Sequence, residues 1–295
     1  MNMREAFVNT TKELIEKDEK TALVLGGISV ASFAECIQKF PDRVFDVGIM
    51  EQTGIGIAAG MAITGMIPIY HTIAPFLAER AYEQLKIDFG YQKIGGNFIS
   101  NGASIDYSSF GATHQCPAEV AILKQIPGMQ IVTAGTAKEF EALYKANYNN
   151  GKPTYYRMCR ETNTFDNDVV LGKANVIKRG KQLTVLAVGP MLKLAIDATE
   201  GLDVTILYYT SVAPFDYETL SNNCPSGRVI VCEPYYKGAL LYDVVRALGG
   251  NISYIETFGL PHVFCEHYGT TTQNMEYWGL TARELHDCVL KCSEG

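Results

Sequence analysis

Short apolar runs that alternate with helix-length segments constrain the fold of this chain more than any other feature of its sequence. The first half has six such runs: TALVLGG, RVFDVGI, IPIYHTI, GGNFISN, MQIVTAG and PTYYRMC. Helical patterns such as FLAERAYEQLKIDF and KEFEALYKANYNN lie between them. Strands separated by helices pair in parallel, because each helix carries the chain back along a face of the sheet. We therefore predict an α/β fold with a mostly parallel sheet that helices cover on both faces.

The same alternation starts again after a polar stretch, ETNTFDNDVVLG, which follows Arg160. A second series of strand-like runs begins at QLTVLAVG and continues through DVTILYY, RVIVCEP and NISYIETFG. We predict two α/β domains of this kind, over residues 1–163 and 172–295, joined by a linker over residues 164–171. A chain of 295 residues is long enough for two such domains.

Composition argues against several classes of partner and site. The chain has 25 basic and 32 acidic residues and no strongly basic segment, so we expect no nucleic-acid partner. No apolar run is long enough to cross a bilayer, and the first residues are patterned as an amphipathic helix rather than a secretory signal. We therefore expect a cytoplasmic protein without a membrane partner. The eight cysteines are scattered and form no CxxC pair, so we expect reduced, mostly buried thiols and no metal site.

Glu51 is an unexpected acid in the stretch FDVGIMEQTGIGIAAGMAITG. It stands between an apolar run and a helix made almost entirely of small and apolar residues. An acid in the first turn of a helix is stabilised by the free backbone amides there, which is one explanation. The glycines also suggest a dinucleotide-binding loop, but the GxGxxG pattern fails at Ala59. The small residues are better explained by close packing of the helix on its neighbours.

Four blocks, in the same order and at similar spacing, give Glu51 a third interpretation. They are FDVGIMEQTGIGIAAGMA, TIAPFLAERAYEQLKID, GATHQCPAE and IPGMQIVTAGTAKE. Together they resemble the C-terminal half of transketolase. They are also similar to deoxyxylulose-phosphate synthase and, more distantly, to the β subunit of 2-oxoacid dehydrogenases. The resemblance continues through LTVLAVGPMLKLAIDA, APFD and YWGLTARELHD. It implies a pyrimidine-binding domain followed by a transketolase C-terminal domain.

The resemblance implies roles for four residues near a cofactor, thiamine diphosphate. Glu51 matches the acid that bonds to the pyrimidine ring and moves a proton there, which activates the cofactor. Phe76 matches an aromatic residue that stacks on that ring. Ile73 stands where a second aromatic residue is common, and Val30 where a side chain supports the bent cofactor.

Other residues match positions that contact the substrate. His114, in GATHQ, matches a histidine that faces the donor, where an imidazole can donate a hydrogen bond or move a proton. Arg160 matches a phosphate-binding arginine, whose planar guanidinium suits two phosphate oxygens, and we expect the nearby Arg157 to be structural. A surface ion pair is the alternative for either arginine. Arg4 stands where the family has another phosphate contact.

Two positions depart from the family pattern. Phe110 stands just before GATHQ, where transketolases that use ordinary sugar phosphates have an acid that binds a donor hydroxyl. An aromatic ring cannot accept that bond, so we expect Phe110 to change how the donor is bound, with Asp106 as the alternative acid. Ser29 replaces an acid in the early turn GGIS. Both changes concern the substrate more than the cofactor.

The diphosphate end of the cofactor lacks its usual motif. Thiamine-diphosphate enzymes hold it and Mg²⁺ through a separate domain marked by GDG, and no GDG occurs in these 295 residues. We therefore expect a partner, an N-terminal transketolase subunit that carries the diphosphate site and supplies most of the groups that bind Mg²⁺. Family architecture then suggests an α₂β₂ heterotetramer.

The expected function is that of the pyrimidine-binding subunit of a split transketolase, active only with its partner. It would transfer a two-carbon ketol unit between sugar phosphates or related sugars. One alternative is a subunit of a decarboxylating enzyme that acts on a small 2-oxoacid, which Phe110 favours. The other alternative is a non-catalytic regulatory homologue, against which the intact Glu51, Phe76 and His114 argue.

Overall fold

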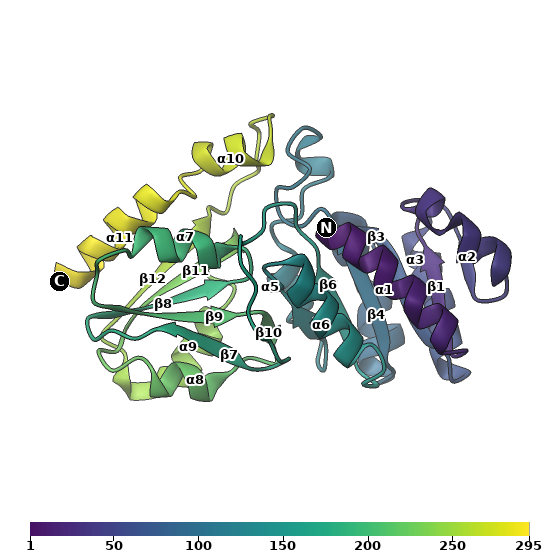
Figure 1. The fold of residues 1–295 in the computed structure, drawn as a ribbon, viewed down its shortest axis with the longest axis horizontal. Helices are drawn as coiled ribbons and strands as arrows, with labels where there is room; N and C mark the ends of the chain where they lie inside the picture. Colours follow the sequence, from purple (N-terminus) through teal and green to yellow (C-terminus); the bar gives the residue numbers. More distant parts are fainter. Residues whose placement is uncertain (295) are drawn as a thin grey trace.

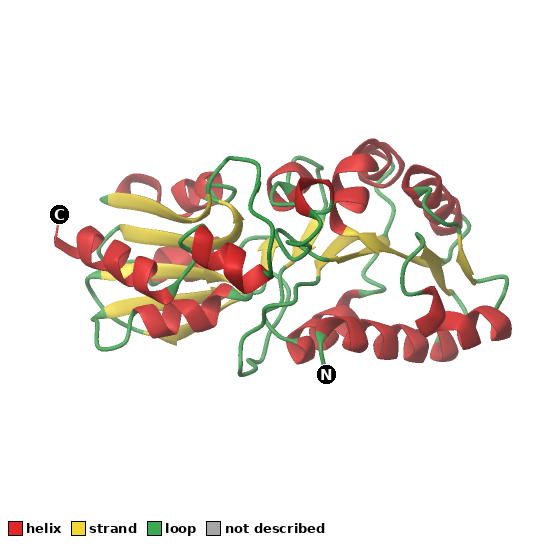
Figure 2. Ribbon diagram, turned by 90° about the horizontal axis from the view of Figure 1, so that it is seen from above, coloured by secondary structure: helices red, strands yellow, loops and turns green. Residues whose placement is uncertain are grey.

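Two α/β domains lie side by side in the computed structural model, which describes residues 1–294 (Figure 1). Each contains one mostly parallel sheet, of seven strands in the first domain and five in the second. Helices cover both faces of each sheet (Figure 2). The predicted fold class is therefore confirmed.

The first sheet has the strand order β10-β5-β6-β4-β3-β1-β2. All its pairs are parallel except that of β10 with β5. Parallel strands end at the same edge, so the loops that follow β1, β3, β4 and β6 meet there. The strands are β1 (Thr21–Leu25), β2 (Val44–Asp46), β3 (Ile67–Ile73), β4 (Gly96–Asn101), β5 (Gln130–Val132), β6 (Pro153–Arg157) and β10 (Ser211–Ala213).

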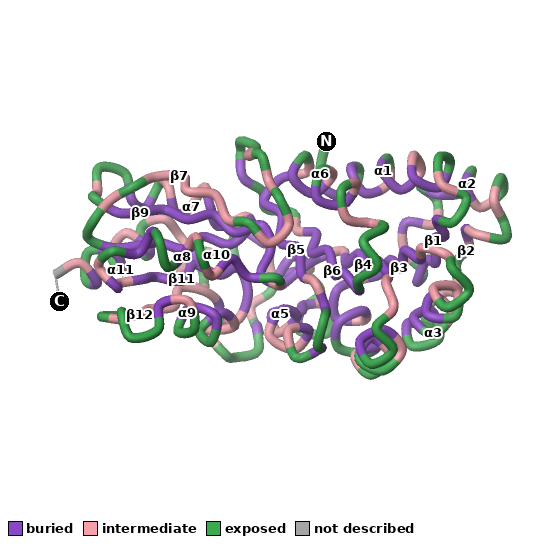
Figure 3. Tube along the Cα trace, turned by 90° about the horizontal axis from the view of Figure 1, so that it is seen from below, coloured by how far each residue is buried: buried purple, intermediate pink, exposed green. Residues whose placement is uncertain are grey.

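Residues that alternate along these strands enter two separate hydrophobic clusters. Leu23 and Leu25 of β1 pack with the helices α1 and α6, whereas Val24 packs with the helices on the opposite face. This alternation explains why β1 is buried along its whole length, with side chains packed on both faces of the sheet (Figure 3). The helical segments are α1 (Met3–Lys17), η1 (Val30–Phe33), α2 (Ala34–Lys39), α3 (Glu51–Ile63), η2 (Phe76–Arg80), α4 (Tyr82–Gln84), η3 (Leu85–Tyr91), η4 (Gly111–Thr113), α5 (Glu119–Leu123) and α6 (Ala137–Asn147).

The second sheet has the order β12-β11-β8-β9-β7, in which only β7 is antiparallel to its neighbour. Helices α7 and α11 pack on one face, and α8 and α9 on the other. The elements are β7 (Ala174–Lys178), β8 (Leu183–Val188), α7 (Met191–Ala198), β9 (Val204–Tyr209), α8 (Tyr217–Asn222), β11 (Arg228–Tyr236), α9 (Leu241–Leu248), η5 (Gly249–Asn251), β12 (Tyr254–Leu260), α10 (Thr271–Tyr277) and α11 (Ala282–Glu294).

A strand and a hydrophobic cluster connect the two domains at their junction. The short strand β10 follows β9 of the second sheet but pairs with β5 of the first, where Ser211 lies opposite Val132. One hydrophobic cluster also contains residues of both domains, such as Val120 and Val244. The domains are therefore packed as one body at this junction.

Several features bear on the expectations from composition. Six cysteines are buried, and Cys159 and Cys288 are partly exposed. Within residues 1–294, no group of three or more His, Cys, Asp or Glu side chains is arranged to hold a metal ion. None of the helices described is both long and apolar enough to span a membrane.

The glycines of α3 fall into two kinds. A methyl group on Gly54 would come within 2.4 Å of a ring carbon of Tyr70, so α3 can lie this close to β3 only with glycine at that position. Gly60 faces open space on the same helix. Close packing, rather than phosphate binding, therefore accounts for Gly54.

This difference predicts opposite effects of one substitution on stability. Gly54→Ala should lower the free energy of unfolding by about 1–3 kcal/mol, because overpacking outweighs the better helix propensity of alanine. Gly60→Ala, the matched control, should raise it by up to about 1 kcal/mol. Urea unfolding of both variants measures these changes. Equal effects at the two positions would contradict the packing argument.

Candidate active site

Glu51 begins α3, directly after the loop that follows β2, and its side chain is only 1% exposed. Oε2 accepts a hydrogen bond from Arg80 Nη1 at 2.7 Å. Oε1 is also buried, and no group in the described part of the chain donates to it. Burying a polar oxygen without a partner is costly, so Oε1 can accept a hydrogen bond from a group outside the described chain.

Arg80 joins Glu51 to Phe76. Its guanidinium carbon lies 4.1 Å from the centre of the Phe76 ring, a stacking distance. Phe76 and Arg80 are the first and last residues of η2, a π-helical turn that brings the Arg80 guanidinium over the Phe76 ring. The guanidinium therefore contacts both a flat aromatic face and a buried carboxylate.

His114 lies in a cluster of aromatic rings beside Phe76. Its ring centre is 5.3 Å from that of Phe76, 4.9 Å from that of Phe110 and 5.9 Å from that of Tyr107. Thr113 Oγ1 lies 2.9 Å from His114 Nδ1. The structure thus brings together Glu51, Phe76, His114 and Phe110, which are widely separated in the sequence.

Ile73 and Val30 lie at the carboxyl ends of neighbouring strands. Ile73 is the last residue of β3, and Val30 begins η1 after β1. Both are partly buried, and Val30 packs against the hydrophobic cluster beneath α1. They share the sheet edge with Glu51, and their predicted roles toward the cofactor stay predictions.

Arg4 is bonded to Ser29 rather than left free. Its Nε and Nη2 donate to Ser29 Oγ at 3.2 and 3.0 Å, and that hydroxyl lies 2.9 Å from His71 Nε2. Burial lowers the pKa of His71 to about 3, so the ring is neutral. Because His71 Nδ1 lies 2.8 Å from the Ile99 carbonyl oxygen, we assign the proton to Nδ1, and Nε2 then accepts from Ser29.

Arg157 and Arg160 differ in environment. Arg157 is buried, and its Nε donates to Glu119 Oε1 at 2.7 Å, as a structural arginine would. Arg160 is exposed, and its guanidinium carbon lies 5.5 Å from the centre of the Tyr107 ring. Arg160 thus reaches the margin of the aromatic cluster around His114, whereas Arg157 is held inside the protein by Glu119.

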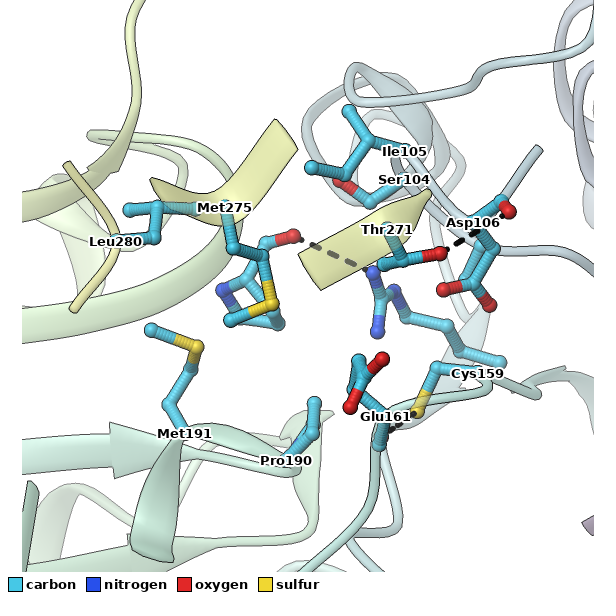
Figure 4. Close-up of a pocket in the computed structure, with 13 residues that line it drawn as sticks. Ser104, Ile105, Asp106, Cys159, Glu161, Pro190, Met191, Thr271, Met275 and Leu280 are labelled. Atoms are coloured by element: carbon cyan, nitrogen blue, oxygen red, sulfur yellow. Dashed lines mark hydrogen bonds between the residues drawn. The ribbon is translucent and has the colours of Figure 1, made fainter. Parts of the chain in front are cut away.

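Asp106 faces a cavity between the two domains (Figure 4). The cavity measures about 50 Å³, and its lining includes Asp106, Cys159 and Met191 but none of Glu51, Phe76 and His114. Asp106 Oδ2 accepts from the backbone N–H of Arg160 at 2.8 Å. Burial raises its pKa to about 7, although Arg157 and that N–H favour the charged form.

A family model described as the transketolase pyrimidine-binding domain matches residues 1–164, more than half of the chain. The chain belongs to the transketolase family. A second model, the transketolase C-terminal domain, matches residues 172–285. Both matches confirm the resemblance found in the sequence.

Two similar proteins and one solved structure illustrate the match. An uncharacterized 33.6 kDa protein in the fasciation locus of Rhodococcoides fascians is 33% identical, over 98% of this chain and 94% of that protein. The 6-deoxy-6-sulfo-D-fructose transketolase subunit SqwH of Clostridium sp. (strain MSTE9) is 28% identical, over 96% and 92%. A solved structure described as a split gene transketolase, an inactive beta4 tetramer, covers 100% of this chain and 98% of that chain, with TM-score 0.85 and 28% identity.

The transketolase motifs do not single out Arg80. The only signal was its position four residues after Phe76, and a π-helical turn cannot be recognised from that spacing. Tyr107 was also missed, although it lies in the same loop as Phe110. The structure adds both residues to the candidate site.

Proposed function

We propose that this chain is the pyrimidine-binding subunit of a split, thiamine-diphosphate-dependent transketolase. It transfers a two-carbon ketol unit between sugar phosphates or related sugars. The observation that carries the proposal is Glu51 Oε1, a buried carboxylate oxygen without a partner in the described chain, on a side chain that Arg80 links to the Phe76 ring. This arrangement occurs on a chain that matches both C-terminal domains of transketolase.

The residues present fit the pyrimidine half of the cofactor. When bound, thiamine diphosphate supplies a nucleophilic carbon that carries the transferred unit. Glu51 holds a proton at the pyrimidine edge and moves it, and its burial keeps water away from that proton. Phe76 offers its face to the ring, with Ile73 and Val30 at the same sheet edge.

Arg80 has to move aside for this role. Its guanidinium contacts both Phe76 and Glu51 in this chain, at 4.1 Å and 2.7 Å. A pyrimidine ring that uses the same face and the same carboxylate competes with it. The Arg80 side chain is 44% exposed, so it can withdraw into solvent without breaking core packing.

His114 and the two arginines complete the substrate side of the site. Thr113 Oγ1 contacts Nδ1 of His114 and leaves Nε2 to face the substrate. We assign the Thr113 hydroxyl as the donor to Nδ1, so that Nε2 carries the ring proton and donates to an oxygen that gains charge. Arg160 is the phosphate-binding candidate because its guanidinium is exposed at the edge of the cluster. Arg4 is a second candidate, already oriented by Ser29.

A decarboxylating enzyme on a small 2-oxoacid is the second candidate function. The observation that favours it is Phe110, which is 58% exposed and lies 4.9 Å from His114, where a sugar-binding acid would stand. A 2-oxoacid donor needs no acid at that point. A non-catalytic regulatory role gives no reason for the unpartnered Glu51 oxygen.

A partner subunit with the diphosphate and Mg²⁺ site completes the enzyme, in an α₂β₂ assembly. Two observations support this: the chain contains no GDG motif, and it is similar over its whole length to a split gene transketolase chain described as an inactive tetramer. We expect the chain alone to be inactive as well.

The partnership predicts a large difference in cofactor affinity. The chain alone should bind thiamine diphosphate weakly, because most contacts to the diphosphate are missing. The mixture with a diphosphate-domain subunit and Mg²⁺ should bind it tightly and transfer ketol units. Isothermal titration calorimetry measures the affinity of the chain alone and that of the mixture. Thiamine, which lacks the diphosphate, is the control ligand. Micromolar affinity of the chain alone would contradict the split-enzyme proposal.

Phe110 predicts an altered preference for the donor. A hydrogen bond to a charged group contributes about 1.5–3 kcal/mol, so Phe110→Asp should raise the kcat/KM ratio of xylulose 5-phosphate over hydroxypyruvate about ten- to a hundredfold. Phe110→Leu, which removes the ring without adding an acid, is the control and should not. A native complex that already strongly prefers xylulose 5-phosphate over its epimer would show that Phe110 is not at the donor.

A further inference from the structure

The loop that carries His114 is braced by the second domain at several points. Ile105 enters a hydrophobic cluster formed mainly by second-domain residues, among them Leu260 and Leu280. The Asp106 carbonyl oxygen accepts a hydrogen bond from Thr271 Oγ1 at 3.3 Å (Figure 4). Farther along, the Pro117 carbonyl oxygen accepts from the Tyr236 N–H at 3.0 Å.

Tyr268 of the second domain lies against Gly111, three residues before His114. It lies in the segment between β12 and α10, which runs beside the first-domain loop in Figure 1. A methyl group on Gly111 would come within 2.7 Å of Tyr268 Cε1 and 2.8 Å of its hydroxyl oxygen. Gly111 also has a backbone φ of +72°, which residues other than glycine rarely adopt. Glycine is therefore required there for two reasons.

We propose that Tyr268 of the C-terminal domain positions His114 through Gly111 and forms, with Phe110, the outer wall of the substrate entrance. The identity of that entrance rests on the proposed function. Gly111 adjoins Phe110, and the Gly111 carbonyl oxygen accepts from the His114 N–H at 3.0 Å. A ring held against Gly111 therefore limits the movement of Phe110 and His114.

Exposure of the two rings supports their role as a wall. Phe110 is 58% exposed and Tyr268 65%, so both residues are partly packed and partly open to solvent. The wall is apolar apart from one hydroxyl, so it suits the carbon-hydrogen face of a hydroxylated chain, while the phosphate falls to Arg160. Displacement of a catalytic group by about 1 Å can reduce a rate about a hundredfold.

Amide hydrogen exchange of the chain alone tests the positioning. Tyr268→Ala should speed exchange in residues 104–114 several-fold, because the loop opens more often. Tyr268→Phe, which keeps the ring, should exchange like the native chain. Tyr242→Ala removes another exposed tyrosine of the same domain, on α9, and is the matched control. Equal exchange in the two alanine variants would overturn the proposal.

Kinetics of the complex with its partner tests the consequence for His114. With hydroxypyruvate and ribose 5-phosphate as probes, Tyr268→Ala should lower kcat about 10- to 100-fold, with a smaller change in KM and unchanged affinity for thiamine diphosphate. Tyr268→Phe should restore kcat. An unchanged kcat, or no rescue by phenylalanine, would overturn the proposal. The exchange measurement needs neither partner nor substrate, so an inactive native complex would contradict only the proposed function.

Discussion

The buried ion pair between Glu119 and Arg157 is the interaction on which the candidate site depends. Glu119 Oε1 accepts from Arg157 Nε at 2.7 Å and from the Ser104 N–H at 3.0 Å, and Oε2 accepts from the Tyr155 hydroxyl. Arg157 Nη2 donates in turn to the Pro234 carbonyl oxygen of the second domain. Removing one partner of such a pair typically costs about 3–5 kcal/mol, because the other charge stays buried. One ion pair thus connects the start of the His114 loop, the end of β6 and the domain junction.

The loops at one edge of the first sheet present an acid, an aromatic face and an imidazole. Glu51, Phe76 and His114 come from three different segments. Glu51 lies at the start of a helix, Phe76 in a π-helical turn, and His114 in a loop that packs on the second domain. Arg80 fills the space between the first two. The chain therefore holds an arrangement that suits a flat, hydrogen-bonding ring.

Much of the fold could be predicted from periodicity, because a parallel sheet buried on both faces leaves a repeating pattern of apolar runs. Glu51, Phe76 and His114 could be found because each lies in a short block with a family pattern. The pairing of β10 with the first sheet, the Arg80 contact and the approach of Tyr268 to Gly111 could not. Each depends on a local irregularity or on packing between residues far apart in the chain, and neither leaves a periodic signal.

The exchange of the C2 proton of thiamine diphosphate with deuterium, followed by NMR on the complex, tests the role of Glu51 most directly. Glu51→Gln keeps the shape of the side chain but cannot move a proton, so exchange should slow about 10²–10⁴-fold at saturating cofactor. Glu35→Gln changes another first-turn acid, on α2, and should exchange like the native complex. Native exchange in Glu51→Gln would contradict the account and leave Glu51 as an acid that stabilises a helix end.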